Sequence, residues 1–142
     1  DRIGPKRTLD WVLKLWLGTF ALAASVGLLR LPLTWLFVVA GLAGVSLGGI
    51  WAADRPYMLR LTPPDRVGEF YGLYGMVGRF SAVTGPLLWG LTTYLTVERG
   101  GMATVTGQGI AIITLLLMVL LSWKLLRPVS DSPRDWEALR ST

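Results

Sequence analysis

Few kinds of side chain in this sequence could carry catalysis. Its 142 residues include no Cys and no His, which removes thiol nucleophiles, thiolate ligands and imidazole bases. Nine carboxylates and fourteen Lys and Arg residues remain. No nucleophile–base pair or cluster of metal ligands stands out among them. We therefore expect no enzyme, no metal site and no cofactor.

One charged residue lies where a charge is costly. Arg79 is the only charged residue well inside an apolar run from 69 to 97, roughly 15 Å beyond Glu69 along a helix. That depth is near the middle of a hydrocarbon core about 30 Å thick, where charged groups are usually functional. The alternative is a shallower arginine that snorkels to the interface. Arg79 shares one helical face with Gly75, Ala82 and Pro86. We predict that these four residues form a substrate or coupling site.

The composition predicts the elements that would position such a residue. The sequence is 52% hydrophobic and only 16% charged, against roughly 25% charged in an ordinary soluble domain. Four segments approach the roughly 20 apolar residues that span a bilayer. We predict an all-α integral membrane protein with the lipid bilayer as a partner and four transmembrane helices, at about 11–29, 33–53, 69–97 and 110–126.

The segments between these spans are polar. Residues 54–67 contain three prolines and three arginines and are expected to form an aqueous loop, and residues 127–142 a polar cytoplasmic tail. The third span is long, so we expect it to be tilted, or broken near Gly85 and Pro86. Together, residues 1–126 would be part of one transmembrane domain.

Basic residues predict the orientation. The net charge of +5 is not gathered on a soluble face, so we expect no nucleic acid partner. If the loops alternate, Arg30 and Arg99 lie on one side and ten basic residues on the other, which by the positive-inside rule makes both termini cytoplasmic. The ten are Arg2, Lys6, Arg7, Arg55, Arg60, Arg66, Lys124, Arg127, Arg134 and Arg140.

Small residues predict where helices approach one another. Gly44 and Gly48 form a G-x-x-x-G pair in the second span, and Gly72 begins a ridge of small residues in the third. Plain helix packing is the simpler interpretation, and lining of a cavity is the alternative. The fourth span is bulky and apolar on all sides, so we expect it to face lipid.

Two stretches resemble a known family. The opening DRIGPKR resembles the D-R-x-G-[RKP]-[RK]-[RK] loop motif of the major facilitator superfamily. The stretch DRPYMLRLTPPDRVGEFYGLYGMVGRFSAVTGPLLWGL is similar to that family's loop and eleventh helix, in the branch of vacuolar effluxer-like permeases. The resemblance implies that the spans are helices nine to twelve of a major facilitator fold, part of a six-helix bundle. It also implies a cytoplasmic gate motif at Asp1, Arg2, Gly4, Lys6 and Arg7.

The resemblance implies the function. We expect a secondary active transporter that moves a small solute, such as amino acids for efflux, by alternating access. Its partners would be the remaining helices of the same transporter. The protein would be integral to a bacterial inner membrane. Because the chain begins with Asp1 and not Met, we expect a fragment.

Two alternatives remain open. A small four-helix multidrug exporter acting as a dimer would need an acid embedded in the first span, and none lies between Trp11 and Leu29. A membrane scaffold that does not transport is the other.

Overall fold

The computed structural model describes residues 4–129 as a bundle of helices connected by short turns. The prediction of four long helices is confirmed. Two short elements flank the third helix: the 3₁₀ turn η1 (Pro64–Arg66) precedes it, and the π-helical turn η2 (Tyr94–Arg99) follows it. The long helices are α1 (Pro5–Leu28), α2 (Trp35–Leu61), α3 (Val67–Thr93) and α4 (Thr104–Leu126).

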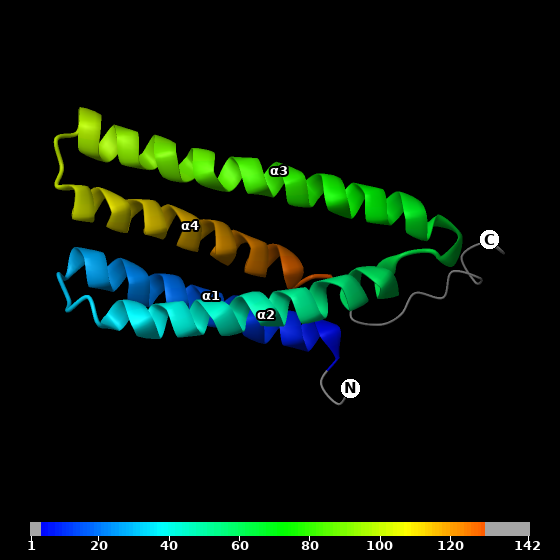
Figure 1. Cartoon of the computed structure of the whole chain (residues 1–142). Coiled ribbons are helices and arrows are strands. Elements are labelled where there is room, and N and C mark those ends of the chain that lie inside the picture. Colours follow the sequence, from blue (N-terminus) through cyan, green and yellow to red (C-terminus); the bar gives the residue numbers. More distant parts are fainter. Residues whose placement is uncertain (1–3, 130–142) are drawn as a thin grey trace.

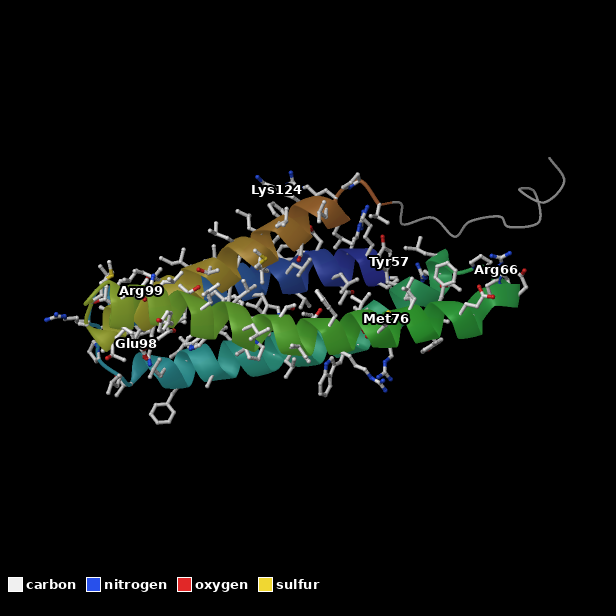
Figure 2. The ribbon with its side chains drawn as sticks, turned by 90° about the horizontal axis from the view of Figure 1, so that it is seen from above. Tyr57, Arg66, Met76, Glu98, Arg99 and Lys124 are labelled. Atoms are coloured by element: carbon white, nitrogen blue, oxygen red, sulfur yellow. The ribbon has the colours of Figure 1, made fainter. Side chains whose placement is uncertain are left out.

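The helices run back and forth along one axis (Figure 1). Helix α1 packs against both α2 and α4, and α4 also packs against α3, which gives the order α2–α1–α4–α3. The start of α1, the end of α4 and the α2–α3 connection lie at one end of the bundle, and the other two turns lie at the opposite end. Figure 2 accordingly shows Arg66 and Arg99 at opposite ends. The predicted alternation of the connections is confirmed.

Three of the described helices are long and apolar enough to cross a membrane: α1, α2 and α4. Their 24, 27 and 23 residues correspond to about 35–40 Å. Helix α3 is 27 residues long but is not among the three, because its glycines, its threonines and Arg79 dilute its apolar side chains. Membrane crossing by α3 therefore stays a prediction.

The expectation of a loop throughout residues 54–67 is wrong, because α2 continues to Leu61 and passes through Pro56. Packing explains the extension. Tyr57 and Ala53 are buried against Leu9 of α1, so the last turns of α2 have a partner helix. The polar composition of this segment reflects its position near the end of the bundle and does not interrupt the helix.

No break occurs at Gly85 and Pro86, so this part of the prediction is wrong. Helix α3 runs through Pro86 to Thr93. The irregularity lies at its end, where η2 leads into the turn before α4. Pro86 removes one backbone donor, but the remaining hydrogen bonds keep the helix continuous.

A close approach of α1 to α4 through glycines was not foreseen from the sequence. A Cβ atom added at Gly27 would lie 3.4 Å from the carbonyl oxygen of Val105 and 3.7 Å from the Cα atom of Gly109. Gly107, Gly109 and Ala111 are buried at the start of α4. The fourth span was expected to face lipid from Ile110 onward; Ala111 is instead buried, whereas later leucines of α4 are exposed.

Hydroxyl groups in the helices bond to their own helix. Thr19 Oγ1 donates to the carbonyl of Leu15 at 2.8 Å, and Ser46 Oγ donates to that of Leu42 at 2.8 Å. The same bond to the residue four positions earlier is made by Ser25, Ser81, Thr84, Thr92, Thr93 and Thr114. These hydroxyls need no second helix as a hydrogen-bond acceptor.

Candidate functional site

The predicted substrate residues lie along an exposed face of α3. Arg79 is exposed and makes no hydrogen bond or ion pair within residues 4–129. A Cβ atom added at Gly72 or Gly75 would meet nothing within 4 Å. Ala82 and Pro86, on the same face, are exposed as well. The described helices therefore leave this side of α3 uncovered, and its role stays a prediction.

The same is true of the glycine pair on α2. Cβ atoms added at Gly44 or Gly48 would meet nothing within 4 Å, so neither glycine packs against another described helix. The packing role predicted for both, and for Gly72, would require a helix from outside this chain. Gly49 does pack: an added Cβ atom would lie 2.6 Å from a methyl carbon of Val12 on α1.

A polar contact joins α2 and α3. The Tyr74 hydroxyl donates a hydrogen bond to Asp54 Oδ2, and the other oxygen of Asp54 accepts from the backbone N–H of Arg55 at 2.6 Å. Asp54 and Tyr74 each lie seven residues from the α2–α3 connection, about 10 Å along the helices. The sequence analysis missed this pair, because nothing in the spacing of Asp54 and Tyr74 indicates that they meet.

Only part of the predicted gate motif lies in the described chain. Asp1 and Arg2 are outside the described residues. Gly4 has φ 72°, in the left-handed region that favours glycine, and Pro5 then opens α1. Lys6 and Arg7 belong to the first turn of α1 and not to a loop.

Lys6 connects this end of α1 to the end of α4. Its Nζ donates to the carbonyl oxygen of Arg127 at 3.3 Å and to that of Val129. These carbonyls are at the C-terminal end of α4, where the helix dipole favours a positive charge. The structure thus brings a residue of the predicted motif to the end of a neighbouring helix.

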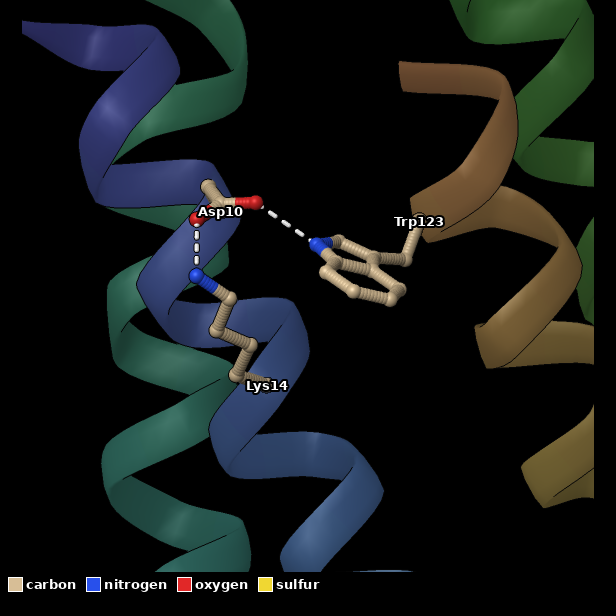
Figure 3. Close-up of polar contacts among 3 residues, drawn as sticks. All are labelled: Asp10, Lys14 and Trp123. Atoms are coloured by element: carbon tan, nitrogen blue, oxygen red, sulfur yellow. Dashed lines mark hydrogen bonds and ion pairs between the residues drawn. The ribbon is translucent and has the colours of Figure 1, made fainter. Parts of the chain in front are cut away.

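A second polar group links the same two helices (Figure 3). Asp10 Oδ2 pairs with Lys14 Nζ at 2.5 Å, and Asp10 Oδ1 accepts from Trp123 Nε1 at 2.6 Å. Arg127 lies over the Trp123 ring, 4.1 Å from its centroid. The spacing of four residues between Asp10 and Lys14 could have predicted their ion pair. The contact with Trp123, 113 residues away, could not be foreseen from spacing.

The side chains brought together here are suited to binding. Residues 4–129 hold no group of three or more carboxylate, His or Cys side chains placed to bind a metal ion. What they offer is an unpaired arginine on an open helix face, a tyrosine–carboxylate contact, and basic residues at one end of the bundle.

Comparison with known proteins identifies the family. A family model described as Major Facilitator Superfamily matches residues 1–141. The chain is 40% identical over 60 residues to an uncharacterized MFS-type transporter, YxiO, of Bacillus subtilis, covering 42% of this chain and 14% of that protein. No solved structure matches the chain.

Fungal relatives are similar over comparable stretches. Autophagy-related protein 22 of Saccharomyces cerevisiae is 33% identical over 58 residues, covering 41% of this chain and 11% of that protein. Autophagy-related protein 22-1 of Neosartorya fischeri is 31% identical over 78 residues, covering 54% of this chain and 13% of that protein. The matched region is thus about one seventh or less of each relative.

The family match extends over nearly the whole sequence, and it agrees with a helical bundle that contains three apolar helices of membrane-spanning length. The family consists of transporters and not of enzymes. This chain is an integral membrane protein that belongs to the Major Facilitator Superfamily.

Proposed function

We propose that this chain is part of a secondary active transporter and forms one wall of its solute pathway. Helices α1 to α4 would be helices nine to twelve of the complete fold, and the rest of the transporter would cover the open sides of α2 and α3. Alternating access would expose the solute site to one side of the membrane at a time.

The open face of α3 is the observation that carries the proposal. Arg79 is exposed there and has no partner among residues 4–129, and the same face holds the small residues Gly72, Gly75 and Ala82. In a bilayer, an arginine at mid-span requires an acceptor from protein, water or solute. A small-residue face provides space for that acceptor. Helix α3 is also the one long helix of the described chain that is not among the three apolar helices of membrane-spanning length, as expected for a helix beside an aqueous cavity.

The solute class follows from the site and the resemblance together. A guanidinium binds carboxylates with two parallel hydrogen bonds, so a carboxylate-bearing solute would match Arg79. Similarity to vacuolar effluxer-like permeases favours amino acids moved in the efflux direction.

The bacterial relative favours a bacterial inner membrane. The excess of basic residues at the end that holds the α2–α3 connection favours a cytoplasmic location for that end and for both termini.

Transport by arginine variants would test the proposal. The full-length transporter would be reconstituted in liposomes and exchange of a radiolabelled amino acid mixture measured for Arg79→Ala, Arg79→Lys and the control Arg99→Ala, which removes an arginine from the turn after α3. We expect both Arg79 variants to lose at least tenfold in exchange rate, since a tenfold loss needs only about 1.4 kcal/mol. The control should retain its rate.

Two results would contradict the proposal in different ways. Normal exchange by both Arg79 variants would remove Arg79 from the solute site. Absence of exchange by the unmodified transporter, for every amino acid in the mixture, would reject the solute class.

A further inference from the structure

The end of the bundle formed by α1 and α4 contains a basic cavity whose described lining residues include none from the α3 face proposed to contact solute. The cavity has a volume of about 320 Å³. Both helices contribute to it, α1 with its first turns and α4 with its last. The lining residues are Lys6, Arg7, Asp10, Leu126 and Arg127.

Among the described residues, Asp10 is the one carboxylate that lines this cavity, and both of its oxygens already have partners. One oxygen of Asp10 pairs with Lys14 and the other accepts from the Trp123 indole. Lys6 is likewise engaged, since its ammonium bonds to carbonyls at the end of α4.

The two arginines that line the cavity are available for an anion. Arg7 is exposed and makes no hydrogen bond or ion pair within the described chain. The guanidinium of Arg127 lies over the Trp123 ring, 4.1 Å from its centroid, and donates no hydrogen bond within the described chain. The N-terminal end of the α1 dipole adds to the positive potential. The first turn of α1 contains no acidic residue that would offset it.

The surroundings indicate a lipid. Trp11 and Leu125, within a few residues of the cavity along α1 and α4, are 68% and 64% exposed. Tryptophan and arginine beside exposed leucines are typical of the boundary between headgroups and acyl chains. Basic pockets between membrane helices at the cytoplasmic surface bind phosphate headgroups of anionic lipids.

We propose that the cavity lined by Lys6, Arg7 and Arg127 binds the headgroup phosphate of an anionic phospholipid. The two arginines donate to the phosphate, and the acyl chains lie along the apolar sides of α1 and α4. The bound lipid connects the start of α1 to the end of α4 beyond the contacts that these helices make directly.

Lipid titration monitored by native mass spectrometry would test this. The full-length transporter in detergent would be titrated with phosphatidylglycerol and, separately, with zwitterionic phosphatidylcholine. The test variant is Arg7→Ala/Arg127→Ala. The control is Arg60→Ala/Arg66→Ala, which removes two exposed arginines at the same end of the bundle but outside the cavity. A third variant, Arg7→Lys/Arg127→Lys, keeps the charge.

The expected result is a selective loss. Each basic residue near an anionic lipid contributes about fivefold to binding, so the double alanine variant should bind phosphatidylglycerol roughly thirtyfold more weakly. The control should bind as the unmodified protein does, and the lysine variant should lie in between. Phosphatidylcholine binding should be weak and should not change between variants.

Three outcomes would overturn the proposal. Equal binding of both lipids by the unmodified protein would exclude selection for negative charge. An equal loss in the control would indicate a general electrostatic effect. Displacement of phosphatidylglycerol by millimolar inorganic phosphate would assign the cavity to a soluble anion and not to a lipid.

Discussion

The contact between the start of α4 and η2 leaves no room for a side chain at Gly107. A Cβ atom added there would lie 2.8 Å from Thr96 Oγ1 and would also overlap a methyl group of Val97. Both residues are β-branched and therefore have restricted rotamers. Thr96 is further fixed by a hydrogen bond of 2.8 Å to the carbonyl of Thr92. We therefore predict that Gly107→Ala destabilises the transporter.

The magnitude follows from two opposing effects. Overpacking of this kind costs about 1–3 kcal/mol. Replacing glycine by alanine in a helix stabilises by up to about 1 kcal/mol. Gly18→Ala is the matched control, because it gains the same helix propensity while its added Cβ atom meets nothing within 4 Å. The difference in unfolding free energy between the two variants should therefore be about 1–3 kcal/mol, with Gly107→Ala the less stable.

Unfolding of the purified full-length transporter by increasing mole fractions of sodium dodecyl sulfate would measure this difference. A rescue variant sharpens the test: Val97→Ala removes the overlapping methyl groups, so Gly107→Ala should cost less in a Val97→Ala background. The reasoning would be refuted if Gly107→Ala and Gly18→Ala had equal stability, or if Val97→Ala gave no rescue.

Three further predictions concern the ends of the bundle. In an otherwise cysteine-free full-length transporter, Arg99→Cys should react with an impermeant thiol reagent added to intact cells and Arg60→Cys should not; the opposite pattern would reverse the topology. Asp54→Ala and Tyr74→Phe should be non-additive in unfolding free energy by about 0.5–2 kcal/mol, since the two residues share a hydrogen bond, and strict additivity would rule out that bond. Lys6→Met should destabilise by about 0.3–1 kcal/mol in the same unfolding assay at low salt, because it removes a positive charge from the end of α4, and no change would show that the contact contributes nothing.

The helices were predictable from the sequence because each depends on a local property. Runs of apolar residues fix where a chain can lie in a bilayer, and polar connections separate them. Their exact ends were less predictable. Helix α2 extends to Leu61 because Tyr57 packs on Leu9 of α1, and such a contact between distant residues is not visible in local composition.

The candidate site was predictable only in part. Arg79 is conspicuous because a charge inside an apolar run is rare. The Asp54–Tyr74 contact and the Asp10–Trp123 contact depend on how two helices are rotated and aligned against each other. The packing glycines were assigned to Gly44, Gly48 and Gly72, whereas the described glycines that pack against another element include Gly27, Gly49 and Gly109, whose positions do not follow a G-x-x-x-G spacing.

The hydroxyl groups that bond within their own helices bear on how this protein is made. A Ser or Thr hydroxyl that bonds within its own helix presents no unsatisfied donor to lipid, so these groups do not hinder a helix from entering the bilayer during synthesis before any neighbouring helix has arrived. Arg79 has no such local partner within the described chain. Stable insertion of α3 should consequently wait for other parts of the protein, so that the membrane integration of this helix depends on assembly order.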